Sequence, residues 1–154
     1  MVRRVFRPGH PTDRRPPFRF AAYTRVAFSD TDAQGVVYYG RYLPYFDLAR
    51  TEYHRELGEL GAGRTEFVLR ASNVEYHAPA RFDDLLEVFV RVERIGRTSV
   101  TYEYAAYKIR PDAEDVLMVT ATQTLVLIDH DDRRTLPVPD RFRAKVSEFE
   151  GAGL

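Results

Sequence analysis

Residues 85 to 95 alternate between aliphatic side chains and mostly charged ones, the pattern of a strand that buries one face. The aliphatic positions are Leu86, Val88, Val90 and Val92, and those between them are Glu87, Phe89, Arg91 and Glu93. Composition and spacing predict further strands over 18–29, 67–76, 99–109 and 116–128. On the first of these we expect one face to carry Phe20, Ala22, Thr24, Val26 and Phe28.

A long helix is predicted between the first two strands. Apolar residues recur there at helical steps, at Tyr42, Phe46, Ala49, Tyr53 and Leu57. Pro44 fits only a first turn or a kink, so the helix begins between residues 37 and 43. It ends at a group of glycines, Gly58, Gly61 and Gly63. A short second helix is predicted over 139–149, with Asp140 in its first turn.

The predicted order of strand, long helix and four strands is typical of an α+β fold, with one helix against an antiparallel sheet. One helix covers only part of a five-stranded sheet. We therefore expect apolar surface and at least one strand edge to be buried against a partner subunit. The ten Tyr and ten Phe also suit an interface.

The first 17 residues differ in composition from the rest. Arginines outnumber acids there and four prolines interrupt regular structure. We expect an extended or mobile basic tail over 1–17, followed by a single domain over 18–150. A solvated tail is the simplest interpretation. The alternative is a tail that binds a phosphate-bearing ligand or partner.

Composition excludes several classes of protein. The 154 residues suit one domain with a real core. No apolar run is long enough for a membrane helix and no signal peptide is evident, so we expect a cytoplasmic protein without a membrane partner. The chain has no cysteine, which excludes disulfides and thiolate chemistry. Its net charge of zero gives no indication of a nucleic-acid partner.

Candidate chemistry lies in the polar loop before the long helix. Asp30 and Asp32 precede Gly35, where the backbone can bend closely around a ligand. The unpaired N–H groups at the start of a helix can polarise a carbonyl, and a carboxylate from the preceding loop would lie beside it. On spacing alone, two aspartates that merely cap a turn and a helix remain an alternative. A calcium loop is excluded, because the later ligand positions are missing.

The complete string FSDTDAQGVVYYGRYLPYFDLARTEYHRELG resembles the signature of hot-dog-fold acyl-CoA thioesterases, in the 4-hydroxybenzoyl-CoA thioesterase family. The resemblance continues in NVEYHAPARFDDLLEV, RIGRTSVTYEY and VTATQTLVLID, and spans about residues 23–142. It implies a curved, antiparallel five-stranded sheet wrapped around one long helix. It also implies homo-oligomers, either dimers or dimers of dimers (homotetramers), with sites at the subunit boundary.

The resemblance implies hydrolysis of an acyl-CoA thioester without cofactor or metal. The catalytic carboxylate of the family falls on Asp32, as nucleophile or general base, and its oxyanion donor is the backbone N–H of Tyr39. Many bacterial members have His at the position of Tyr39, so a backbone role is favoured here. Asp30 is expected to shape the loop. Further expected substrate contacts are Gln34 and Gly35 at the thioester, Tyr38, Tyr42 and Tyr45 in the acyl pocket, and Arg97 at the nucleotide. Arg81 and Arg94 are weaker candidates for the nucleotide.

Two other functions stay open. An acyl-thioester dehydratase can have the same fold, but its chemistry usually needs a His, which the key loop lacks. A non-catalytic module that binds acyl-CoA or an acyl-carrier protein is the second. The motif does not identify the acyl group, so aromatic, short-chain and carrier-bound thioesters all remain candidate substrates.

Overall fold

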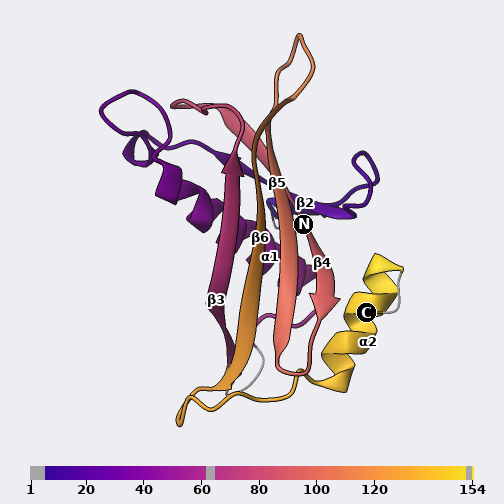
Figure 1. Ribbon diagram of the computed structural model, residues 1–154. Helices are drawn as coiled ribbons and strands as arrows, with labels where there is room; N and C mark the ends of the chain where they lie inside the picture. The colour runs from indigo at the N-terminus through magenta and orange to yellow at the C-terminus, as the bar shows by residue number, and fades with distance from the viewer. Residues whose placement is uncertain (1–5, 62–64, 152–153) are drawn as a thin grey trace, which may run out of the picture.

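The computed structural model describes residues 6–61, 65–151 and 154, and shows one antiparallel sheet packed against a long helix (Figure 1). The strand order is β1-β2-β4-β5-β6-β3. The strands are β1 (Gly9–Pro11), β2 (Phe20–Arg25), β3 (Thr65–Tyr76), β4 (Leu85–Ile95), β5 (Ser99–Lys108) and β6 (Val116–Asp129). The helices are α1 (Tyr42–Glu56), α2 (Asp140–Glu150) and the 3-10 turns η1 (Phe28–Asp30) and η2 (Tyr39–Arg41).

The main core lies between α1 and the inner face of the sheet. The aliphatic positions of β4 are all buried there, as their alternation predicts. From α1, Phe46 stacks on Tyr104 of β5 with ring centroids 4.7 Å apart. The helix begins at Tyr42, inside the predicted interval, and Gly58 follows its end with φ of +72°. Gly63 lies outside the described residues.

The structure differs from the predicted strands in two details. Within the described residues the sheet has six strands, because β1 adds to the five predicted ones. The second strand ends at Arg25, and Phe28 is 77% exposed in η1. The chain leaves the sheet at Val26, whose N–H and carbonyl pair with the loop residues Asp84 and Asp83. Phe28 therefore cannot continue the inward face that Phe20 begins.

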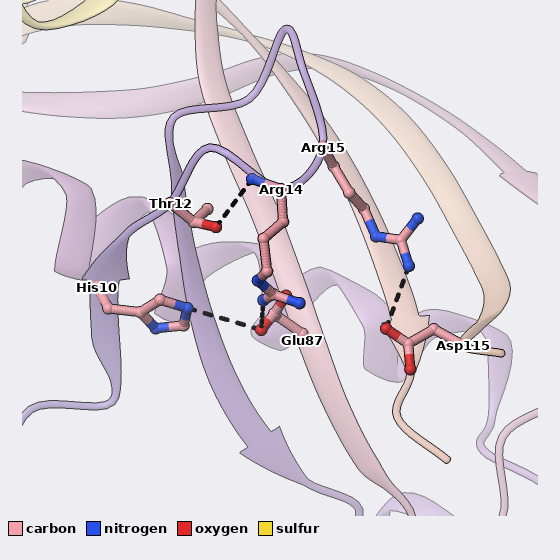
Figure 2. Close-up of polar contacts among 6 residues, drawn as sticks. All are labelled: His10, Thr12, Arg14, Arg15, Glu87 and Asp115. Carbon is pink, nitrogen blue, oxygen red and sulfur yellow. Dashed lines mark hydrogen bonds and ion pairs between the residues drawn. The ribbon is translucent and has the colours of Figure 1, made fainter. Parts of the chain in front are cut away.

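Residues 12–19, here called the N-terminal strap, cross the outer face of the sheet between β1 and β2. The Arg14 guanidinium pairs there with the buried carboxylate of Glu87, which also lies 3.6 Å from His10 Nε2 (Figure 2). Arg15 pairs with Asp115 at 3.1 Å (Figure 2). The described part of the predicted tail is therefore fixed to the sheet, and two of its arginines are engaged by carboxylates rather than free for a phosphate. Residues 1–5 lie outside the described residues.

The strap also covers a second hydrophobic cluster, on the outer face of the sheet. Phe89 is fully buried although it faces away from α1, and Arg15 lies over the ring of Tyr107 at 3.7 Å. The residues of this outer cluster are Phe18, Ala21, Phe89 and Ala105, with Tyr107 and Leu117 packed against them. The outward positions of β4 were expected to be the less buried ones, and the strap makes Glu87 and Phe89 an exception.

A polar contact lies within the main core at the far end of α1. His54 Nε2 is 2.6 Å from the Tyr102 hydroxyl. Burial, and secondarily the nearby Arg50, lower the pKa of His54 to about 4. A neutral imidazole is thus favoured in the folded protein.

The low pKa of His54 predicts acid sensitivity. Between about pH 6.5 and pH 4, His54 binds a proton in the unfolded chain but stays neutral in the folded protein. The free energy of unfolding therefore decreases as pH falls through this window. We expect this group to lower the free energy of unfolding by about 2 kcal/mol over the window, after allowance for its partial exposure. Urea titrations of wild type and His54→Gln at several pH values would measure it. Equal slopes in the two proteins would contradict the assignment.

Candidate active site

The loop that precedes η2 folds into a small hairpin around Asp32. The Asp32 N–H donates to the Val36 carbonyl at 2.9 Å, and the Gly35 N–H donates back to the Asp32 carbonyl at 3.0 Å. Gly35 has φ of +78°, a conformation that side chains disfavour. Asp32 is half-buried as a residue, and its Oδ1 accepts the Gln34 N–H at 2.8 Å. The carboxylate is thus oriented by its own loop at the protein surface.

The Asp30 side chain accepts more hydrogen bonds from the rest of the protein than the Asp32 side chain does. Its Oδ2 accepts hydrogen bonds from the Tyr45 hydroxyl at 2.7 Å and the Ala27 N–H at 2.8 Å. Its carbonyl accepts the Tyr38 N–H at 2.9 Å. Burial, and then the bond to Asp30, raise the pKa of Tyr45, so its hydroxyl remains a donor. These contacts support the loop-shaping role expected of Asp30.

Tyr39 is the first residue of η2, which leads directly into α1. The first N–H groups of a helix have no partner within it, so the Tyr39 N–H has none within the turn that it begins. The Tyr39 side chain is 64% exposed and packs on the Tyr38 ring at 4.3 Å between centroids. Its carbonyl accepts the Tyr76 hydroxyl at 2.9 Å. Asp32 and the Tyr39 peptide therefore lie on the same loop, Asp32 in the hairpin and Tyr39 after it at the start of η2.

The other expected contacts near this loop fall into two groups. Gln34, Gly35 and Tyr38 are exposed beside Asp32, where a substrate could reach them. Tyr42 is only 2% exposed, with its ring against Tyr45 and Tyr76, so it belongs to the core beneath the loop. Burial raises the pKa of Tyr42.

Arg97 is not close to Asp32 within one chain. The loop pairs with residues just before β4, since Val36 bridges to Arg81 and the Val37 N–H donates to Ala80. Arg97 follows the other end of β4, whose 11 residues span roughly 35 Å at a strand rise of about 3.3 Å. Figure 1 shows the β4 arrowhead at the end of the sheet away from the start of α1.

The basic residues beside the loop include Arg41, whose Nε is 3.5 Å from Asp30 Oδ1, and Arg81. A Cβ built on Gly35 would lie 3.9 Å from Arg81 Nη1. Arg81 was expected to be a weaker candidate for nucleotide binding than Arg97, because the sequence does not show which loop an arginine in a turn faces. Tyr76 was missed altogether as a site residue, since it lies 37 positions from its partner Tyr39.

Other features do not indicate a different kind of site. Within the described ranges, no group of three or more His, Asp or Glu side chains is placed to hold a metal ion. No helix in that part of the chain is long and apolar enough to cross a membrane. A cavity of about 840 Å³ lies between the strap and α2, against Val92 and Phe149, and none of the predicted site residues lines it.

Known proteins match most of the chain. A model of the thioesterase superfamily matches residues 34–112. An acyl-CoA thioester hydrolase, YbgC, from Escherichia coli O6:H1 is 35% identical over 130 residues, which cover 82% of this chain and 92% of that protein. An acyl-CoA thioesterase, YbgC, from Haemophilus influenzae is 30% identical over 130 residues, covering 81% and 92%.

Solved structures agree with these matches. A thioesterase superfamily protein from Jannaschia superposes with a TM-score of 0.80 at 24% identity, over 90% of this chain and 87% of that one. The fold likeness confirms the predicted hot-dog architecture apart from the additional edge strand β1. This chain therefore belongs to the thioesterase superfamily, a family of thioester-hydrolysing enzymes, as its sequence motif predicts.

Proposed function

We propose that this protein hydrolyses an acyl-CoA thioester to a free carboxylic acid and CoA, with Asp32 and the Tyr39 N–H as its catalytic groups. The observation that supports the proposal is a single loop in which the half-buried Asp32 is followed by the Tyr39 peptide at the start of η2. The 35% identical relative named as an acyl-CoA thioester hydrolase supports the substrate class.

Two routes are chemically consistent with this arrangement. Asp32 can attack the thioester carbon, with expulsion of the CoA thiolate, and water then hydrolyses the resulting mixed anhydride. Alternatively, Asp32 removes a proton from water, the hydroxide attacks the same carbon with expulsion of the CoA thiolate, and the proton passes from Asp32 to the thiolate. In both routes the carbonyl oxygen becomes negatively charged, and the Tyr39 N–H donates a hydrogen bond to it.

A second copy of the chain would complete the site. Arg97 can contact CoA bound near Asp32 only if a neighbouring copy supplies it, given its place beyond the far end of β4. The edge strand β3 has twelve residues, most of them exposed, and one edge of its backbone is open for pairing. We therefore include a dimer, or a dimer of dimers, in the proposal. A cytoplasmic location stays a prediction.

A thiol-release assay over a panel of acyl-CoAs tests the proposed function. The panel contains short-chain, long-chain and aromatic acyl groups and one acyl-carrier-protein thioester, and free thiol is followed by a chromogenic reagent. We expect at least one substrate to be hydrolysed with kcat/KM of about 10⁴ M⁻¹s⁻¹ or more. Saturable binding without release would instead favour the non-catalytic module. Dehydration of a hydroxyacyl substrate without thiol release would favour the dehydratase.

A further inference from the structure

Tyr76 joins the end of the edge strand to the candidate site. It is the last residue of β3, where it pairs with Val119 of β6. Its ring packs edge-on against the buried Tyr42, with 5.9 Å between centroids, and its hydroxyl donates to the Tyr39 carbonyl at 2.9 Å. A residue of the sheet thereby fixes the backbone of a surface loop.

The Tyr38–Tyr39 segment is held from its other side as well. The Tyr38 N–H donates to the Asp30 carbonyl, and the Asp30 carboxylate is held by Tyr45. After Tyr39 comes Gly40, a residue type whose backbone is the least restricted. The Tyr38 carbonyl, which is in the same peptide as the Tyr39 N–H, accepts the Arg41 N–H at 2.8 Å. Without the bond from Tyr76, the next peptide, between Tyr39 and Gly40, would rotate more easily. The bonds to the Tyr38 N–H and from the Tyr39 carbonyl therefore lie on either side of the Tyr39 N–H.

We propose that Tyr76 is a positioning residue: by holding the Tyr39–Gly40 peptide, it fixes the orientation of the adjoining Tyr38–Tyr39 peptide, whose N–H points at the developing oxyanion. This inference rests on the proposed function. Partial burial, and then the neighbouring Tyr39, raise the pKa of Tyr76, so its hydroxyl stays protonated and able to donate. An oxyanion donor is effective only when it is oriented before the reaction, which gives this bond a role in kcat rather than in substrate binding.

Tyr76→Phe tests the inference, because it removes the hydroxyl and keeps the ring that packs on Tyr42. We expect kcat for the best acyl-CoA of the panel to fall about three- to tenfold, the size of one modest hydrogen bond. KM, the Kd of a non-hydrolysable CoA thioether and the Tm should stay close to the wild-type values. Tyr107→Phe, which removes a hydroxyl on the outer face beneath the strap, is the matched control and should leave kcat unchanged.

The outcomes separate this inference from the proposed function. Unchanged kcat in Tyr76→Phe, alongside an inactive Asp32→Asn, would overturn the role of Tyr76 alone. A parallel loss of thioether binding or of Tm in Tyr76→Phe would show a structural role and also overturn it. A wild-type protein that releases no thiol would overturn the proposed function, and the role of Tyr76 with it.

Discussion

Replacing Asp32 with asparagine is expected to lower kcat for acyl-CoA hydrolysis by about 100-fold or more. The amide can neither attack the thioester carbon nor take a proton from water. It can still accept the Gln34 N–H through its Oδ1, so the loop should keep its shape. Steady-state thiol release and thermal unfolding, measured on the same preparation, would show lost activity at an unchanged Tm.

The neighbouring turn supplies a matched control. Asp83 is an exposed aspartate with φ of +69°, a conformation that asparagine also tolerates. Asp83→Asn makes the same chemical change and should retain wild-type kcat. Near wild-type hydrolysis by Asp32→Asn would remove Asp32 from the mechanism.

The second large effect concerns stability. Arg14→Ala is expected to lower the free energy of unfolding by about 3 kcal/mol, because it leaves the Glu87 carboxylate buried without its main partner. The Glu87 side chain is only 1% exposed, and His10, at 3.6 Å, is a weaker substitute for the guanidinium. Urea unfolding of the wild type and the variant would measure the difference.

Two further variants define the cause. Arg7→Ala removes an exposed arginine of the same N-terminal segment and should change the free energy of unfolding by less than about 0.5 kcal/mol. The double variant Arg14→Met and Glu87→Leu should recover most of the lost stability, because an apolar pair often replaces a buried ion pair without net cost. No destabilisation in Arg14→Ala would show that this pair does not anchor the strap.

Local patterns predicted the elements well, and long-range contacts explain what they missed. The alternation in β4 and the helical spacing in α1 depend only on near neighbours, so both could be predicted. The strap could not, because its arginines and prolines are typical of a solvated segment. Its carboxylate partners, Glu87 and Asp115, lie 73 and 100 residues away in the sequence.

The same distinction applies to the candidate site. Asp30, Asp32 and Gly35 follow one another in the chain, so their shared hairpin could be predicted from turn chemistry. Tyr76 reaches the hairpin only through the pairing of β3 with β6. Spacing alone could not show that Arg97 lies at the opposite end of β4, because the distance between two loops depends on the direction of the strand that joins them.

The two edges of the sheet differ, and this limits how copies can associate. At one edge, the short strand β1 covers the first half of β2 and lies so close to α1 that a Cβ on Gly9 would be 2.6 Å from Glu52 Cβ. At the other edge, β3 is long and open. An open-ended polymer needs two complementary free edges on each copy. A dimer in which β3 of one copy pairs with β3 of the other uses the same edge of both copies, and leaves no β3 edge free for a third copy. A variant that lacks β1 would expose the whole of β2 as a longer free edge opposite β3, and with it a route to fibrous aggregation.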